Sequence, residues 1–312
     1  MKLIFTQKGP MFAKKQKGFT LLELLVVITL LAILSVGALV AYEGIGDNAQ
    51  AVATANNTSG ADRAIRNFRA VTQNYPDQWD SLVTTAGAAP AFLAAETTAA
   101  FSNLPLAVSA APNDFRNLLD QAFEGVGVGA LQIRTVATTT AGIEPNLQHN
   151  EGAALTDAAE TDIDAATNFA VLPTFGTAAC SVNAIPMAAT KLDGATAVAA
   201  ADGERQNIIN DSLESTQCNL VIALGFGHDA AHSTSGSSVA ISTAPTFVSK
   251  TINPNVNYAR YIALFHAGSD SVSPVDNNVS AAELFEKPRL LAVVDTAGRM
   301  IDESIADMNP AN

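Results

Sequence analysis

Glu23 is the residue with the most unusual position, because it is the single charged side chain in the 22-residue apolar run from Phe19 to Val40. A carboxylate inside a membrane helix costs about 2.5 to 3.5 kcal/mol on insertion scales, so such a residue is expected to have a function. The run contains no Lys, Arg or His that could neutralise it. Glu23 therefore needs a partner, and the helix offers no nearby cation.

Two cysteines, Cys180 and Cys218, could form one intramolecular disulfide. In an oxidising compartment this bond would close a loop of about 39 residues and stabilise the fold by roughly 2 to 4 kcal/mol. The alternative is a pair of buried, unpaired thiols. No Cys-x-x-Cys or Cys-x-x-His spacing surrounds either residue, so a metal site is not expected there.

A third candidate is the pair His228 and His232, whose four-residue spacing would suit a metal ion if the segment were helical. The flanking residues 225–227 and 233–238 are rich in Gly and Ser and indicate a loop, so we interpret both histidines as structural or solvent-exposed. The chain contains no Gly-x-Ser-x-Gly sequence, phosphate-binding loop or dinucleotide fingerprint. We predict no catalytic residue, no cofactor and no bound metal.

The run from Phe19 to Val40 is long enough to be a transmembrane helix. Twenty-two helical residues extend roughly 33 Å, and the core of a bilayer is about 30 Å thick. Lysines precede the run and acidic residues follow it, so the positive-inside rule places the N-terminus in the cytoplasm and the body outside. A cleaved signal peptide would have an apolar region of only about 7 to 15 residues.

The exported body is strongly acidic. Five of the 17 basic residues are lysines within the first 18 residues, which leaves 12 basic against 30 acidic residues and a net charge of −18. Proteins bind nucleic acid largely by neutralising phosphates with Lys and Arg. We therefore expect no nucleic-acid binding by this part of the chain.

The sequence Lys17-Gly18-Phe19-Thr20-Leu21-Leu22-Glu23, followed by the apolar run, resembles the leader and methylation motif of type IV pilins and type II secretion pseudopilins. The resemblance is strong over residues 14–45. It implies that a membrane-embedded prepilin peptidase cuts between Gly18 and Phe19 and then N-methylates Phe19. Glycine suits the cleavage position, because a residue without a side chain leaves the scissile bond accessible.

Cleavage would leave a cationic amine on Phe19, which Glu23 of an adjacent subunit could neutralise. The resemblance thus implies a filament subunit whose partners are copies of itself, other pilin-like subunits, the prepilin peptidase, and an inner-membrane platform with its assembly ATPase. The precursor would be a single-pass inner-membrane protein, and the product an extracellular or periplasmic filament. One alternative is a minor pseudopilin or tip subunit of a type II secretion or DNA-uptake system that contacts a substrate or surface. Another is a membrane-tethered exported enzyme that never polymerises.

The implied fold class is α+β and pilin-like, with a long N-terminal α-helix, transmembrane in its first half, packed on a head with an antiparallel β-sheet. The expected divisions are a removed leader at 1–18, a transmembrane and filament-core helix at 19–42, a periplasmic continuation at 43–75 and an exported globular head at 76–312.

Local patterns add expectations about the elements. Glycines at 37, 44 and 46 are expected to bend or melt the long helix, and the segment 56–60 to interrupt it before a new helix that ends at Tyr75-Pro76. Residues 113–133 are expected to be helical. Apolar runs predict strands at 219–226, 258–265 and 289–295, with a turn at 295–299 leading into a last strand at 300–302.

Overall fold

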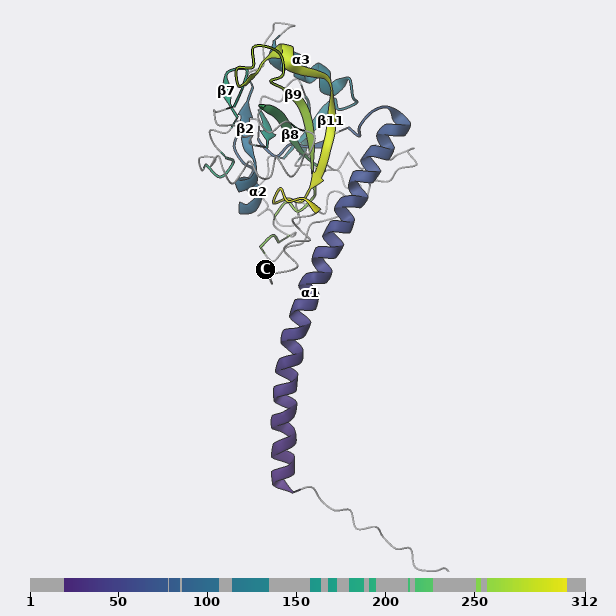
Figure 1. Cartoon of the computed structure of the whole chain (residues 1–312), viewed down its shortest axis with the longest axis vertical. Helices are drawn as coiled ribbons and strands as arrows, with labels where there is room; N and C mark the ends of the chain where they lie inside the picture. Colours follow the sequence, from purple (N-terminus) through teal and green to yellow (C-terminus); the bar gives the residue numbers. More distant parts are fainter. Residues whose placement is uncertain are drawn as a thin grey trace, which may run out of the picture. The chain divides into compact units, whose positions relative to one another are not determined.

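The computed structural model describes residues 20–77, 79–84, 86–106, 114–134, 158–163, 168–172, 180–187, 191–194, 213, 217–226, 251–253 and 257–301. The chain divides into two compact units, residues 1–49 and residues 50–312. Helix α1 (Leu21–Thr72) begins in the first unit and ends in the second (Figure 1). The second unit is called the head below.

Helix α1 is continuous, so the predicted interruption at residues 56–60 is wrong. Thr54 and Thr58 donate their hydroxyl hydrogens to the carbonyl oxygens of Gln50 and Thr54, at 3.0 and 2.8 Å. Both threonines are buried in the head, and the hydroxyl of Tyr261 donates to the Thr54 carbonyl at 3.4 Å. Packing against the head therefore outweighs the weak helix propensity of this segment. The helix also passes through the glycines at 37, 44 and 46 without a break.

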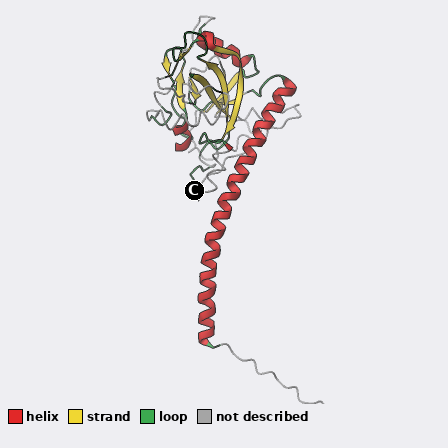
Figure 2. Cartoon of the chain, in the orientation of Figure 1, coloured by secondary structure: helices red, strands yellow, loops and turns green. Residues whose placement is uncertain are grey.

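The head contains the strands and the remaining helices (Figure 2). In chain order these are β1 (Trp79–Asp80), α2 (Ala95–Ala100), β2 (Ser102–Pro105), α3 (Phe115–Glu124), β3 (Ala130–Arg134), β4 (Ala158–Asp162), β5 (Asn168–Val171), β6 (Ser181–Val182), β7 (Ile185–Pro186), β8 (Asn219–Gly225), β9 (Ile262–Ser269), β10 (Asn278–Val279), the 3₁₀ helix η3 (Ala281–Glu283) and β11 (Leu284–Val294).

Eight of the described strands form one sheet in the order β11-β9-β8-β1-β3-β4, with β5 also paired to β8 and β2 paired to β5. All pairs in it are antiparallel except β1 with β3. A smaller sheet has the order β10-β6-β7. The long apolar helix followed by this sheet-rich region agrees with the predicted α+β, pilin-like fold class.

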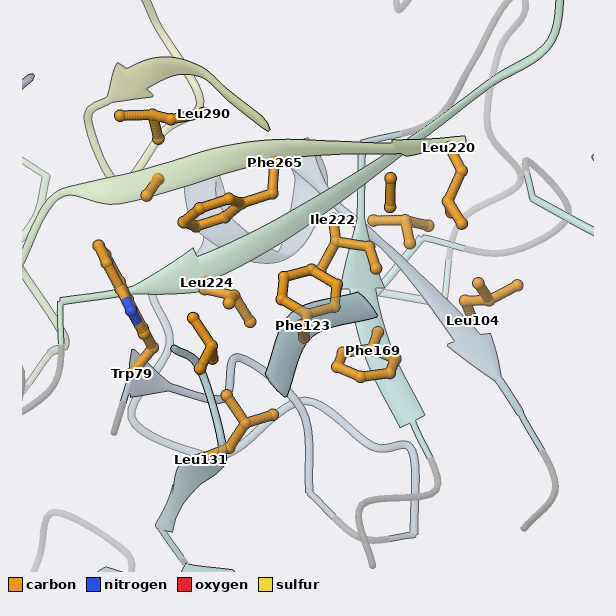
Figure 3. Close-up of a cluster of buried hydrophobic side chains, with 14 of the residues drawn as sticks. Trp79, Leu104, Phe123, Leu131, Phe169, Leu220, Ile222, Leu224, Phe265 and Leu290 are labelled. Carbon is orange, nitrogen blue, oxygen red and sulfur yellow. The ribbon is translucent and has the colours of Figure 1, made fainter. Parts of the chain in front are cut away.

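Both faces of the large sheet are buried, which explains the continuous apolar sequence of β8. Leu220, Ile222 and Leu224 face a core that also contains Ile65 of α1 and Phe123 of α3. The alternate residues of β8 face a second core, formed with residues 82–101 and α2. A strand that is covered on both faces shows no apolar–polar alternation. Figure 3 shows Leu220, Ile222 and Leu224 beside the aromatic side chains of the first core.

Trp79 lies at the centre of the first core and is fully buried. Its ring meets Phe226 and Phe265 edge-on at centroid distances of 5.4 and 5.5 Å. The indole N–H donates to the carbonyl oxygen of Pro76 at 2.6 Å, so its polar atom is satisfied. Aromatic pairs prefer this edge-to-face arrangement over a face-to-face sandwich.

Side chains from the end of α1 and from the segment after it form hydrogen bonds with backbone groups at the outer edge of β11. The Leu290 N–H donates to the Tyr75 hydroxyl oxygen at 2.8 Å. Arg66 donates to the Leu291 carbonyl oxygen at 2.9 Å and to that of Leu290 at 3.4 Å. Arg69 donates to the same Tyr75 oxygen and lies over its ring, 4.4 Å from the centroid. This end of the edge strand is therefore closed to pairing with another strand.

The predicted helix at 113–133 is correct only in its first half. Helix α3 ends at Glu124, and residues 130–134 are strand β3. Gly127 between them has φ = 91°, and a Cβ atom there would lie 2.6 Å from that of Asn74. A positive φ is incompatible with a right-handed α-helix, so the helix does not continue through Gly127, and the contact with Asn74 leaves no room for a side chain there.

The three predicted strands are present as β8, β9 and β11, although β9 begins four residues later than expected. The predicted turn is also present, with the Asp295 N–H donating to the Arg299 carbonyl oxygen at 3.0 Å. The expected strand after the turn is absent at Met300 and Ile301, and residue 302 lies outside the described residues. The Asp295 carboxylate accepts the Ala297 and Arg299 amide hydrogens at 2.8 and 2.9 Å, which is sufficient to define the turn without a second strand.

The disulfide between Cys180 and Cys218 is confirmed, with the two Cα atoms 5.5 Å apart and both residues buried. Cys180 directly precedes β6, and Cys218 directly precedes β8. The bond therefore attaches the small sheet to the central strand of the large one.

The disulfide leads to a prediction about the stability of the head. Replacing both cysteines by alanine is expected to lower the free energy of unfolding by about 2 to 4 kcal/mol, because the closed loop no longer restricts the unfolded chain. The measurement is urea unfolding followed by the fluorescence of Trp79, the only tryptophan. The wild-type chain under a reducing agent serves as the matched comparison. Equal stability of the oxidised and alanine forms would contradict the prediction.

The edge of β11 leads to a second prediction. Tyr75→Phe removes the acceptor of the buried Leu290 N–H and is expected to cost about 1 to 3 kcal/mol of unfolding free energy. Tyr42→Phe is the control, since Tyr42 is 77% exposed and is expected to tolerate the same change without loss. Urea unfolding of both variants checks this, and a Tyr75→Phe protein as stable as the control would be evidence against the role assigned to the hydroxyl.

Candidate functional site

The first turn of α1 holds Glu23 in a reciprocal pair of contacts with Thr20. The Thr20 amide and hydroxyl donate to Glu23 Oε2 at 2.9 and 3.0 Å. The Glu23 amide donates to Thr20 Oγ1 at 3.2 Å. This is a capping box, which satisfies amide hydrogens that have no acceptor at the start of a helix.

The capping box was not predicted, and it gives Glu23 uncharged hydrogen-bond donors and not a cation. The signal was in the sequence, because a Thr followed three residues later by a Glu before an apolar run is the pattern of such a box. Only one carboxylate oxygen is used. Glu23 Oε1 makes no hydrogen bond to any residue that the structure describes. It therefore remains able to accept a hydrogen bond from a cation.

The rest of the first unit's helix is an apolar surface without cover from the chain. Leu21–Leu39 has a mean hydropathy of 2.6, and none of it is buried. Among the described helices it is the one long and apolar enough to cross a membrane. Thr29 and Ser35 donate their hydroxyl hydrogens to the carbonyl oxygens of Val26 and Leu31, at 2.9 and 2.7 Å. These hydroxyls are thus satisfied within the helix and are compatible with lipid.

The other predicted residues are placed only in part. Gly18 and Phe19, the expected cleavage pair, lie outside the described residues, as do His228 and His232. Cys180 and Cys218 are joined to each other in the head and take no part in the segment around Glu23. Among the residues that the structure describes, no three His, Cys, Asp or Glu side chains are grouped so that they could hold a metal ion.

The capping box can be tested separately from any role in assembly. Thr20→Val removes the hydroxyl and is expected to weaken the helix start by about 1 kcal/mol, so the Glu23 amide should exchange its hydrogen roughly fivefold faster in detergent micelles. Thr29→Val is the control, because the Thr29 hydroxyl bonds only to its own helix. Unchanged exchange at Glu23 in Thr20→Val would show that the box does not hold the first turn.

Comparison with known proteins finds a family motif in this N-terminal segment. Residues 13–39 match the family model of the prokaryotic N-terminal methylation motif. No curated protein and no solved structure matches the chain. The matched residues include Gly18, Phe19 and Glu23, together with the apolar surface of Leu21–Leu39. This match, together with the sheet-rich head that follows the long helix, supports a type IV pilin-like prepilin.

Proposed function

We propose that this chain is a structural subunit of a type IV pilus-like filament. The leader is removed between Gly18 and Phe19, Phe19 is N-methylated, and the mature subunits assemble through the first part of α1. The proposal assigns the chain an assembly role and no catalytic one.

The observation that carries the proposal is the exposed apolar surface of Leu21–Leu39 with a single carboxylate at its beginning. Leu21 is 84% exposed and Ile33 is 73% exposed, so the chain alone does not cover this surface. Lipid can cover it in the precursor, and the same segments of other copies can cover it in a filament. Because lipid tails are as apolar as leucine, apolar contact alone does not draw helices out of a membrane.

A polar contact is therefore needed to make the association specific, and Glu23 can supply it. Cleavage of the leader creates an α-amine on Phe19, a group that is mostly protonated at neutral pH. Glu23 Oε2 accepts from Thr20, whereas Oε1 makes no hydrogen bond within the described part of the chain and can accept from an amine of a neighbouring copy. An unpaired charge in an apolar setting is costly and a well-placed pair is much less so, so the pair favours one axial register between subunits.

The proposed partners follow from this scheme. They are further copies of the chain, other pilin-like subunits, the prepilin peptidase, and the inner-membrane platform with its assembly ATPase. The precursor is a single-pass inner-membrane protein, and the filament is extracellular or periplasmic. A minor subunit of a secretion or DNA-uptake system would use the same N-terminal chemistry, and its scarcity in sheared filaments would distinguish it from a major subunit.

The proposal predicts that Glu23→Ala and Glu23→Gln are both processed normally and both fail to form filaments. Glutamine keeps an oxygen that can accept the Thr20 hydrogen bonds but has no charge, so the pair of variants separates charge from capping. Ser35→Ala is the control, since the Ser35 hydroxyl bonds within its own helix. Mass spectrometry of the exported chain should find an N-terminus at methylated Phe19 in all variants, and filaments are quantified by shearing.

Several outcomes would contradict the proposal. A mature chain that keeps its lysine-rich leader, or one released by cleavage beyond Val40, would exclude assembly through this helix. Filaments at wild-type yield in Glu23→Ala would show that assembly does not depend on the carboxylate.

A further inference from the structure

His266 is a buried histidine of β9 whose two ring nitrogens are both engaged, and it is only 2% exposed. Nδ1 lies 3.3 Å from Nε and 3.1 Å from Nη2 of Arg289 on β11. Nε2 lies 3.0 Å from Oδ1 of Asn219 on β8. A guanidinium can only donate, so Nδ1 must be the acceptor and Nε2 carries the hydrogen that Asn219 accepts. The site therefore fits a neutral imidazole, and a backbone hydrogen bond with Gly268, which raises the pKa, is the weakest of the influences on the ring.

The charges around the ring also oppose protonation. Burial, and secondly the positive charge of Arg289, lower the pKa of His266 to about 4. The neighbour on β8, Asn219, is neutral. The adjoining residues Glu286 and Lys287 of β11 are exposed.

Two carboxylates close to this end of β9 are occupied elsewhere. Asp270 accepts the amide hydrogens of Asp276 and Asn277, and Glu283 accepts those of Val272 and Ser280. Neither carboxylate shifts the pKa of His266, so among the described residues no carboxylate offsets the charge of Arg289.

The ladder between β9 and β11 is interrupted beside this histidine. Leu284 is opposite Gly268 and Arg289 is opposite His266, so the four residues 285–288 of β11 bypass a single residue of β9. Phe285 at the start of this bulge meets the His266 ring edge-on, with the ring centroids 4.7 Å apart. Arg289 at its other end holds Nδ1. Both ends of the bulge therefore contact the His266 ring.

The same bulge forms one wall of a groove on the head surface. The groove has a volume of about 350 Å³ and lies between α3 and the beginning of β11. Leu118 and Gln121 line it from α3, and Leu284, Phe285 and Glu286 line it from β11. Phe285 therefore connects the buried histidine with the groove, because its ring contacts the one and lines the other.

We propose that neutral His266 keeps residues 284–289, and with them the wall of this groove, attached to β9, and that protonation of His266 releases them. A proton on Nδ1 removes the acceptor that Arg289 uses and places a positive charge on the buried ring, beside the guanidinium of Arg289, which is itself an exposed residue. The bulge then detaches from β9 and the groove changes shape. Near neutral pH the imidazole is neutral and residues 284–289 are attached to β9, which is the closed state. In the open state these residues are detached.

The direction of the pH effect follows from the difference between the closed and open states. In the open state His266 is hydrated and titrates near the ordinary value of about 6.5. In the closed state the pKa is about 4. The open state therefore binds the proton first, and the closed state is progressively disfavoured as the pH falls from about 6.5 to about 4. Below this window the pH has no further effect through this residue.

The test is hydrogen–deuterium exchange of the full-length chain in detergent micelles, compared at pH 7.5 and pH 5 after correction for the intrinsic exchange rates. The two pKa values imply that opening of residues 284–289 increases about 30-fold between these pH values. In His266→Gln the increase should disappear, because the glutamine oxygen can accept from Arg289 and its amide can donate to Asn219 at either pH. Arg63→Gln, a change at an exposed arginine of α1, is the control and should keep the full increase.

A second variant keeps the proposal testable if His266→Gln fails to fold. Arg289→Met removes the opposing cation, so the increase between pH 7.5 and pH 5 should be smaller than in the wild type. Equal exchange of residues 284–289 at both pH values in the wild type would overturn the proposal. An increase that persists at full size in His266→Gln, or one spread evenly over the whole head, would overturn it as well.

Discussion

The apolar surface of Leu21–Leu39 is the constraint on which the rest of the molecule depends, because none of it is buried by the residues that the structure describes. A surface of this length is stable only against lipid or against other helices of the same kind. The head must therefore fold without using the first unit. It does so around its own two cores, on the two faces of a sheet whose central strand β8 is buried throughout.

Much of this organisation could be predicted from local patterns in the sequence. The transmembrane segment was identifiable from its length and apolarity, and the strands β8, β9 and β11 from short apolar runs between turn residues. The pairing of Cys180 with Cys218 followed from having two thiols in a chain whose sequence predicts export. The contact between Thr20 and Glu23 was equally local, and recognising the spacing of a capping box would have been sufficient to predict it.

The features that could not be predicted depend on contacts between distant parts of the chain. Asn56-Asn57-Thr58-Ser59-Gly60 is a poor helix sequence, yet it is helical because Thr54 and Thr58 are buried against the head. Arg116 would be expected on the surface. Instead it is buried on α3, where it pairs with Asp120 at 3.0 Å, lies 4.5 Å from the centroid of the Phe169 ring and donates to the carbonyl oxygen of Ile163. Propensity and periodicity do not contain the tertiary contacts that satisfy such a charge.

The disulfide between Cys180 and Cys218 also has a consequence for the resistance of the head to proteolysis. Its two sulfur atoms join positions separated by 38 residues. A protease that cut the backbone once anywhere between them would leave two fragments still linked through sulfur. Strand β8 and the small sheet would stay attached to each other, and the nicked subunit would keep its place instead of shedding a piece of its head.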